Sequence, residues 1–272
     1  MKTSYDQHVI VITGGSSGIG KALALHYHAL GAKVAVCGRN AQALEALQNQ
    51  VVDASRLFTV QADVARRDDC KRFIEAIIAR YGRLDVLICN AGLSMRALFA
   101  DLQDLRPIEQ LMQVNFWGAV YCIHYALPYL LQSRGVIVGM SSIAGYRGLP
   151  GRTGYSASKF ALQGFLESLR TELLHSGVHV MWICPGFTAS NIRQTALNEK
   201  GEQQGETPLD ESKLMPAERV AVLAERAIAR RKRTLVLTTQ GKLTVWINRI
   251  FPGWADHLVY QHFRKEPGSP LK

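Results

Sequence analysis

Residues 8–30 read HVIVITGGSSGIGKALALHYHAL: a β-branched run, a glycine-rich turn and an amphipathic helical stretch. Glycines in such a turn adopt positive φ and leave bare backbone against which a pyrophosphate lies. The start of the following helix supplies free N–H groups and partial positive charge to that pyrophosphate. The stretch therefore predicts a dinucleotide-binding strand, turn and helix, with the candidate contacts Gly14, Ser16, Ser17, Gly18, Ile19 and Gly20.

A loop for nucleoside triphosphates is the rival interpretation of the same glycines. Gly15 and Gly20-Lys21 have the spacing of the GxxxxGK[ST] loop, but the next residue is Ala22, which has no hydroxyl to bind Mg²⁺. The apolar run LDVLIC (84–89) also carries its only acid near its start rather than at its end. The residues therefore disfavour a triphosphatase.

Short apolar runs alternate with longer helical patterns along the first 190 residues. Strands buried on both faces of a parallel sheet are apolar throughout, and strand–helix alternation is typical of right-handed crossovers. The predicted strands are 8–13, 33–37, 56–60, 84–89, 135–140 and 179–184, and the predicted helices are 18–30, 41–50, 66–81, 107–131 and 155–175. We expect an α/β fold, a doubly wound parallel sheet (Rossmann fold) in a single domain.

The chain changes character after the last of these strands. Residues 198–213 are almost wholly polar, which predicts a mobile substrate loop over about 187–215. Pro216 opens a predicted helix that runs to about Arg231, TLVLTT (234–239) reads as a strand, and 243–263 as an amphipathic element. We expect residues 1–240 to form the dinucleotide-binding and catalytic domain and residues 241–272 to form an amphipathic, basic tail.

Composition limits the class of protein. The 272 residues are 47% apolar and 20% charged, as in an ordinary globular chain. The sequence has no run of about 18 apolar residues that would span a membrane, and its N-terminus lacks the apolar region of a signal peptide. Five scattered cysteines without a CxxC pair fit a reducing compartment and have no metal-ligand spacing. We expect a cytoplasmic protein that needs no metal.

The net charge of +10 is concentrated near the C-terminus, because residues 226–272 hold ten basic residues and two acids. An apolar stripe recurs there at intervals of three and four and is interrupted near Pro252-Gly253, where a kink is expected: Leu243, Trp246, Ile247, Ile250, Trp254 and Leu258. We expect this stripe to pack over the substrate pocket, on its own domain or on a second subunit. Peripheral membrane contact is a second role, and we expect no nucleic-acid partner.

The end of the second predicted strand indicates which dinucleotide is bound. A site that prefers NAD places a carboxylate there to bind the ribose 2′-hydroxyl. Here the sequence is Cys37-Gly38-Arg39-Asn40, and Asp53 lies beyond the next predicted helix. A guanidinium suits the additional 2′-phosphate, so the sequence favours NADP(H) over NAD(H).

A second group of polar residues follows the later strands. Tyr155 and Lys159, in YSASK, lie at i and i+4 and so on one face of a helix, where an ammonium would lower the pKa of the phenol. Alone, such a spacing is equally that of a surface pair. Ser142 comes thirteen residues before Tyr155, at the end of a strand, and Asn90-Ala91-Gly92 ends another. Ligands bind beyond the carboxyl ends of parallel strands, so these groups converge on the glycine turn.

On these motifs the chain resembles the short-chain dehydrogenase/reductase family over about residues 8–190. TGGSSGIG matches the TGxxxGxG turn, Asn90-Ala91-Gly92 the NAG motif and YSASK the YxxxK motif. Cys184-Pro185-Gly186 matches the Pro-Gly motif, and Ser190 replaces the usual threonine of PGxxxT. The resemblance implies further nucleotide contacts at Arg39, Asn40, Asp63, Val64, Asn90, Ala91, Gly92, Tyr155, Lys159, Pro185, Gly186 and Thr188. Ser17 departs from the basic residue that many NADP-preferring members carry there.

The resemblance also implies catalytic roles. Ser142 would orient the substrate carbonyl, Tyr155 would donate the proton, and Lys159 would bind the nicotinamide ribose and lower the tyrosine pKa. Asn115 falls at the position of the catalytic asparagine, which would hold a water beside Lys159. The neighbouring hydroxyl of Ser141 is the alternative to Ser142, but the thirteen-residue spacing favours Ser142.

The function expected is an NADPH-dependent oxidoreductase that interconverts a ketone and a secondary alcohol. The glycine turn TGGSSGIGK, the segment YSASKFA and the long tail are similar to those of ketosphinganine reductase-like and steroid dehydrogenase-like members. This similarity suggests a bulky or lipidic substrate. A 3-oxoacyl thioester reductase stays open, since a set of arginines could bind an acidic group or merely be solvated: Arg96, Arg147, Arg152 and Arg193. A non-catalytic dinucleotide-binding sensor or scaffold is the other alternative, and a homodimer or homotetramer is expected.

Overall fold

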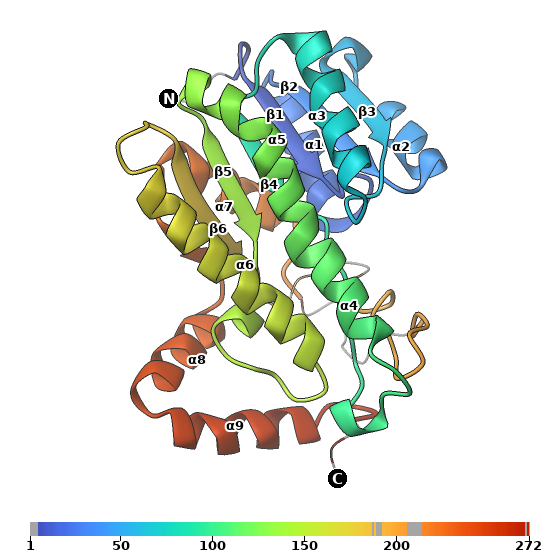
Figure 1. Cartoon of the computed structure of the whole chain (residues 1–272), viewed down its shortest axis with the longest axis vertical. Helices are drawn as coiled ribbons and strands as arrows, with labels where there is room; N and C mark the ends of the chain where they lie inside the picture. Colours follow the sequence, from blue (N-terminus) through green and yellow to red (C-terminus); the bar gives the residue numbers. More distant parts are fainter. Residues whose placement is uncertain (1–4, 187, 189–191, 206–213, 270, 272) are drawn as a thin grey trace.

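The computed structural model describes residues 5–186, 188, 192–205, 214–269 and 271, and Figure 1 shows a central sheet with helices on both faces. The seven strands are all parallel, in the order β3-β2-β1-β4-β5-β6-β7. This is the doubly wound sheet predicted, with its switch point between β1 and β4. In chain order the strands are β1 (Val9–Thr13), β2 (Lys33–Gly38), β3 (Leu57–Gln61), β4 (Val86–Cys89), β5 (Val136–Met140), β6 (His179–Cys184) and β7 (Thr234–Val236).

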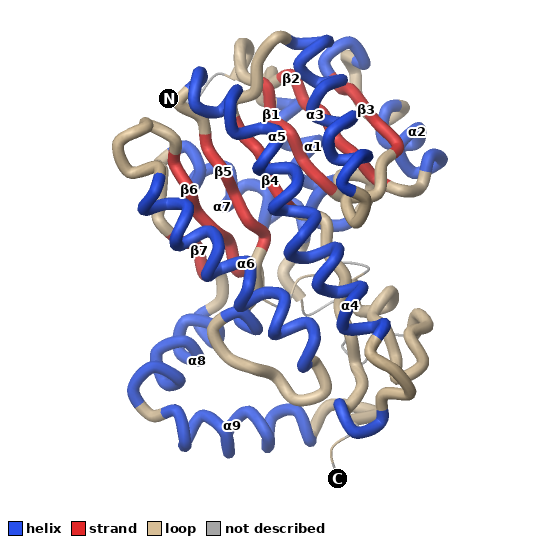
Figure 2. The backbone as a smooth tube through the Cα atoms, viewed as in Figure 1, coloured by secondary structure: helices blue, strands red, loops and turns tan. Residues whose placement is uncertain are grey.

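The sheet divides the apolar core into two layers. Val9 and Val11 face one layer of helices, whereas Ile10 and Ile12 face the other, because successive side chains of a strand alternate. Figure 2 shows the helices of both layers against the strands. The helices are α1 (Gly18–Ala29), α2 (Ala41–Gln48), α3 (Arg67–Tyr81), α4 (Arg106–Met112), α5 (Gly118–Ser133), α6 (Thr153–Glu172), α7 (Ala217–Ala229), α8 (Thr239–Ile250) and α9 (Pro252–Arg264).

The structure differs from the predicted elements at two places and agrees with the predicted break in the tail. The helix predicted over 107–131 is divided by a π-helical turn, η3 (Gln113–Trp117), between α4 and α5. The strand predicted over 234–239 ends at Val236, because the Thr238 hydroxyl accepts a hydrogen bond from the Gly241 N–H (3.0 Å) and caps α8. The amphipathic element is two helices, and Pro252 begins the second, as the predicted kink required.

The region after β6 is only partly described. Within the predicted mobile loop, residues 187, 189–191 and 206–213 lie outside the described residues, and so does Ser190. The described part packs on the segment after β4, since the Leu197 N–H donates to the Ser94 carbonyl (2.9 Å) and Leu197 is buried. The mobility of the loop and the boundary after residue 240, which falls within α8, stay predictions.

Candidate active site

The turn after β1 needs glycine for steric reasons. Gly14 has φ +65°, and a Cβ there would lie 2.8 Å from the Ala91 Cα atom. A Cβ on Gly20 would lie 2.2 Å from the Gly14 carbonyl oxygen. Glycine at position 14 lets the turn approach the end of β4. Glycine at position 20 lets α1, which begins at Gly18, pack closely on the turn.

Thr13 joins the two strands at the switch point. Its hydroxyl accepts hydrogen bonds from the N–H groups of Asn90 and Ala91 (3.0 Å each). The Asn90 amide in return donates to the carbonyls of Thr13 (3.0 Å) and Gly14 (3.1 Å). The Asn90-Ala91 segment and the glycine turn are therefore fixed against each other, a role for Thr13 that sequence reasoning missed.

A cavity of about 330 Å³ runs along this edge of the sheet, at the carboxyl ends of the strands. It brings together most of the nucleotide contacts expected from the sequence: Gly14, Ser16, Ser17, Gly18, Ile19, Arg39, Asp63, Val64, Asn90, Ala91, Gly92, Tyr155, Lys159, Pro185, Gly186 and Thr188. Eleven further residues line it that were not expected as nucleotide contacts: Cys37, Gly38, Ala62, Leu93, Val114, Met140, Ser141, Ser142, Ile192, Arg193 and Thr195.

Two expected nucleotide contacts do not line the cavity. Gly20 serves the packing of α1 on the turn. The Asn40 side chain caps α2 by accepting a hydrogen bond from the Ala43 N–H (3.0 Å). Asparagine at a helix start is the ordinary signal for a cap, and that signal was available in the sequence.

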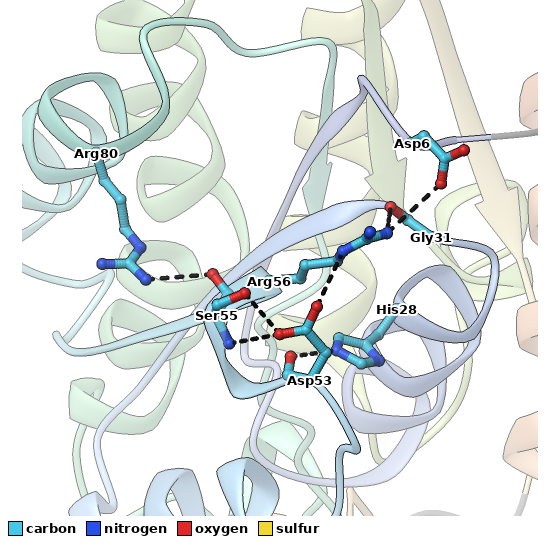
Figure 3. Close-up of polar contacts among 7 residues, drawn as sticks. All are labelled: Asp6, His28, Gly31, Asp53, Ser55, Arg56 and Arg80. Carbon is cyan, nitrogen blue, oxygen red and sulfur yellow. Dashed lines mark hydrogen bonds and ion pairs between the residues drawn. The ribbon is translucent and has the colours of Figure 1, made fainter.

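The end of β2 presents an exposed arginine and no acid. Arg39 lines the cavity. A Cβ on Gly38 would lie 2.8 Å from the Ser16 hydroxyl, so Ser16 lies next to the end of β2. Asp53 precedes β3 and lies at the opposite, amino end of that strand (Figure 3). Its carboxylate accepts from the Ser55 N–H (3.0 Å) and pairs with Arg56 (3.1 Å), and the hydrogen bonds from Ser55 lower its pKa. Asp53 is therefore a structural residue.

Tyr155 and Lys159 lie in the first two turns of α6. The Lys159 ammonium lies 5.6 Å from the centre of the Tyr155 ring and donates to the Met140 carbonyl (2.9 Å) at the end of β5. Burial lowers the pKa of Lys159 to about 8. Burial also raises the pKa of Tyr155, and a hydrogen bond with Ser142 offsets this only in part. The expected lowering of the tyrosine pKa is therefore not found in the protein without nucleotide, because desolvation of the phenolate dominates.

The two adjacent serines after β5 have different partners. Gln163 of α6 donates through Nε2 to the Ser141 hydroxyl (2.7 Å), and both side chains are buried. The Ser142 hydroxyl accepts from the Ala144 N–H (3.2 Å) and is hydrogen bonded with Tyr155. Ser142 is thus the hydroxyl beside the tyrosine. Gln163, which no motif had indicated, holds the segment that carries it.

Asn115 lies in the π-helical turn, behind the cavity. It is 1% exposed; its Oδ1 accepts from the Leu93 N–H (2.7 Å), and its Nδ2 donates to the Leu93 carbonyl (3.0 Å) and the Ser158 hydroxyl (2.9 Å). Ser158 in turn donates to the Tyr155 carbonyl (2.7 Å). Asn115 therefore couples the segment after Gly92 to the start of α6. Ser158 was another residue that sequence reasoning missed.

A second cavity, of about 360 Å³, meets the first at Ser142, Tyr155, Gly186, Ile192 and Arg193. Its opposite wall is formed by α8 and α9 and is mainly apolar: Leu243, Ile247, Ala255, Leu258, Val259 and Phe263. Of the predicted stripe, Leu243, Ile247 and Leu258 line this wall of their own domain, whereas Trp246, Ile250 and Trp254 are exposed. The tyrosine hydroxyl region is where the two cavities join.

The arginines near the second cavity are engaged within the protein. Arg152 pairs with Glu266 (3.1 Å), and its guanidinium lies 4.6 Å from the centre of the Phe263 ring. Arg147 pairs with Asp256, and Arg96 donates to the Pro267 carbonyl. Arg193 donates to the Thr188 carbonyl (2.9 Å). Three of these four arginines therefore hold the C-terminal segment against the body of the protein.

Residues 8–201 match the model of the short chain dehydrogenase family. The chain belongs to this family. This family binds a nicotinamide dinucleotide, and the matched residues include the glycine turn and every residue that lines the first cavity. Among the described residues, no cluster of metal-ligating side chains is found and no helix is long and apolar enough to cross a membrane.

Several relatives of this short-chain dehydrogenase carry steroid names. It is 40% identical over 188 residues to "11-beta-hydroxysteroid dehydrogenase 1A" of Arabidopsis thaliana, a match that covers 68% of this chain and 54% of the relative. The match thus spans about half the length of that plant protein. It is 33% identical over 270 residues to "Dehydrogenase/reductase SDR family protein 7-like" of Dictyostelium discoideum, covering 96% and 83%.

Solved structures of short-chain dehydrogenases share the fold. The Burkholderia phymatum enzyme in complex with NAD superposes with a TM-score of 0.82 at 23% identity, covering 93% of this chain and 96% of the other. The Thermococcus sibiricus alcohol dehydrogenase complexed with 5-hydroxy-NADP gives 0.73 at 22% identity, covering 85% and 95%. At this identity the likeness concerns the fold alone.

Proposed function

We propose that the protein is an NADPH-dependent reductase that interconverts a ketone and a secondary alcohol on a bulky, uncharged, lipidic substrate. The observation that carries the proposal is the position of Ser142 and Tyr155 at the junction of the two cavities. A dinucleotide in the first cavity and an apolar substrate in the second would meet at these hydroxyls. A binding protein without catalysis would not need such a junction.

In this proposal Tyr155 donates the proton to the substrate oxygen. Its raised pKa keeps the phenol protonated at neutral pH, as a donor in the reducing direction requires. Ser142, hydrogen bonded with Tyr155, would bind the same oxygen and orient it. A nicotinamide bound in the first cavity supplies or accepts the hydride.

Lys159 and Asn115 would support the proton donor. A lysine whose pKa is about 8 exchanges protons near neutral pH, and its ammonium would stabilise the phenolate that Tyr155 leaves behind. Asn115 is proposed as a positioning residue, because it contacts Leu93 and Ser158. The water that the family resemblance implies beside it stays a prediction.

NADP(H) rather than NAD(H) is proposed because the end of β2 offers a guanidinium and no carboxylate. Arg39 is exposed at the cavity, with the Ser16 hydroxyl beside the same strand end. A 2′-phosphate would accept charge-assisted hydrogen bonds there. An NAD ribose would find no carboxylate for its 2′-hydroxyl at the end of this strand.

The substrate class follows from the second cavity. Its apolar wall suits a hydrocarbon skeleton, and the hydroxysteroid dehydrogenase names of the relatives agree with a rigid lipidic ketone. The arginines that a 3-oxoacyl thioester on an acidic group would need already hold Glu266, Asp256 and backbone carbonyls. An uncharged substrate is therefore proposed over a 3-oxoacyl thioester carried on an acidic group.

The test is turnover of a ketone panel by the purified protein with NADPH and with NADH. We expect reduction of steroid-like and long-chain ketones with NADPH, and poor reduction of carrier-linked 3-oxoacyl thioesters. Preference for the thioesters would favour the alternative substrate, and binding of NADPH without turnover of any ketone or alcohol would favour a sensor. The cytoplasmic location and the homodimer or homotetramer stay predictions.

A further inference from the structure

Helices α8 and α9 carry a group of exposed apolar side chains. Trp246 and Trp254 are 54% and 60% exposed, and Phe251, at the junction of the helices, is 52% exposed. Leu243, Ile250 and Leu258 are also exposed, and together these six residues are here named the aromatic face. Figure 1 shows α8 and α9 beyond the sheet, at the end of the molecule that carries the C-terminus. Exposed apolar side chains gathered on one element mark an interaction surface.

The charges around the aromatic face are of one sign. The only acids after residue 238 are Asp256 and Glu266, and both are paired with arginines of the body, Arg147 and Arg152. Four cations of α8, α9 and the residue after α9 are exposed: Lys242, Arg249, Arg264 and Lys265. None of these four forms an ion pair among the described residues. The face therefore combines aromatic side chains with cations that attract an anionic surface.

The aromatic face is continuous with the second cavity. Leu243 and Leu258 are 53% and 44% exposed, and both also line that cavity. Trp246 and Trp254 lie on the same helices and do not line it. An apolar path thus leads from the exposed face to the wall opposite Tyr155.

We propose that the aromatic face docks on an anionic lipid surface and turns the apolar cavity toward the bilayer, so that a lipidic substrate enters from the membrane. The entry of substrate rests on the proposed function, whereas the docking does not. A second copy of the chain is disfavoured as the occupant, because an isologous contact would oppose two cationic surfaces on molecules of net charge +10.

The test uses the full-length protein with vesicles of phosphatidylcholine containing phosphatidylserine and with vesicles of phosphatidylcholine alone. We expect co-sedimentation with the anionic vesicles that weakens in high salt, and a shift of tryptophan emission to shorter wavelength. Trp246→Ser/Trp254→Ser should weaken vesicle binding by at least about tenfold. Lys242→Glu/Arg249→Glu should abolish the preference for phosphatidylserine.

The matched control is Val52→Ser/Leu174→Ser, which removes two exposed apolar side chains elsewhere and should leave vesicle binding unchanged. Turnover of a water-soluble ketone should be equal in all of these variants, so this assay reports the proposed function separately from docking. The proposal is overturned if the wild type does not sediment with vesicles, or if the control loses binding equally. It is also overturned if the tryptophan variant lowers the mass of an oligomer while no form binds lipid, since the face would then join two copies.

Discussion

Burial acts in opposite directions on the pKa values of Tyr155 and Lys159. Tyr155 must stay protonated until the substrate oxygen takes its proton, and burial keeps its pKa high. Lys159 is 4% exposed, and burial favours its neutral form. Desolvation thus keeps the Tyr155 phenol neutral and destabilises the charged form of Lys159. A bound nucleotide and substrate would change the surroundings of both groups and therefore both pKa values.

Tyr155→Phe should lose turnover by about 10²–10⁴-fold and keep its affinity for NADPH, because only the proton donor is removed while the ring remains. Steady-state reduction of a ketone and fluorescence titration with NADPH measure the two effects. Tyr146→Phe is the matched control, since its hydroxyl accepts a hydrogen bond from the Trp182 indole (2.8 Å) and it lines neither cavity. Turnover in Tyr155→Phe equal to that of the control would exclude the mechanism.

Arg39→Asp should weaken NADPH by about 10–100-fold, the equivalent of about 1.5–3 kcal/mol for a hydrogen bond to a charged group, and NADH far less. The aspartate removes the guanidinium and repels the 2′-phosphate. Arg219→Asp makes the same charge change on exposed α7 and should leave both affinities unchanged. A wild-type protein that already prefers NADH would show the assignment to be wrong.

Lys159 should make stability depend on pH in the protein without nucleotide. Its pKa is about 8 when folded and 10.5 in the reference state, so between these values the unfolded chain binds more protons. Stability then rises with pH, by at most about 1.4 kcal/mol per pH unit, and this gain is lost as pH falls to 8. Urea unfolding of wild type and Lys159→Met across this range should show the difference increasing with pH, whereas exposed Lys71→Met should show none. A flat difference for Lys159→Met would mean that the ammonium is solvated.

At the scale of elements, the sequence predicted the types of the helices and strands and their order better than the breaks within a helix. The strands were predictable because buried parallel strands are apolar throughout, as the fully buried VIVIT of β1 shows. The π-helical turn at Gln113–Trp117 was not, since a π turn changes backbone hydrogen bonds without changing apolar spacing. The contacts of Asn115 with Leu93 and Ser158 depend on that turn, so its geometry could not be derived from periodicity.

Two ion pairs hold α9 and the segment after it, and we expect them to differ in strength. Glu266 and Arg152 have side chains that are 6% and 14% exposed, so Glu266→Gln should leave a buried guanidinium unpaired and destabilise the protein by about 3 kcal/mol. The Asp256 side chain is 66% exposed and Arg147 keeps its hydrogen bond to Asn248 (3.0 Å), so Asp256→Asn should change stability less. Urea unfolding of both variants compares the same acid-to-amide change at two depths. Equal effects would mean that Glu266 does not neutralise Arg152.

At the scale of the whole molecule, the nucleotide cavity could be predicted from the sequence, whereas the second cavity could not. The nucleotide cavity follows from strand ends that meet at one edge of a parallel sheet, which a sequence can indicate through motifs. The second cavity depends on where α8 and α9 lie. The apolar stripe predicted that one side of these helices is buried, but it could not predict which surface they pack against. That position depends on contacts of Arg147, Arg152 and Arg96 with Asp256, Glu266 and Pro267, and no motif in the sequence indicates these contacts.

This division yields a prediction for a chain that ends at Leu237. Both core clusters draw only on residues up to Val236, so the shortened protein should keep the sheet and its affinity for NADPH. More than half of the residues that line the second cavity come from Thr238–Phe263 and would be lost. A bulky ketone that loses contacts worth two to three methylene groups would lose about 2 kcal/mol, or about thirtyfold in kcat/KM, while a small ketone would lose little. Circular dichroism, NADPH titration and kinetics on the two ketones measure these effects. Equal kcat/KM losses for both ketones would show that the second cavity does not hold the substrate, and lost NADPH binding would show that the tail supports the nucleotide site.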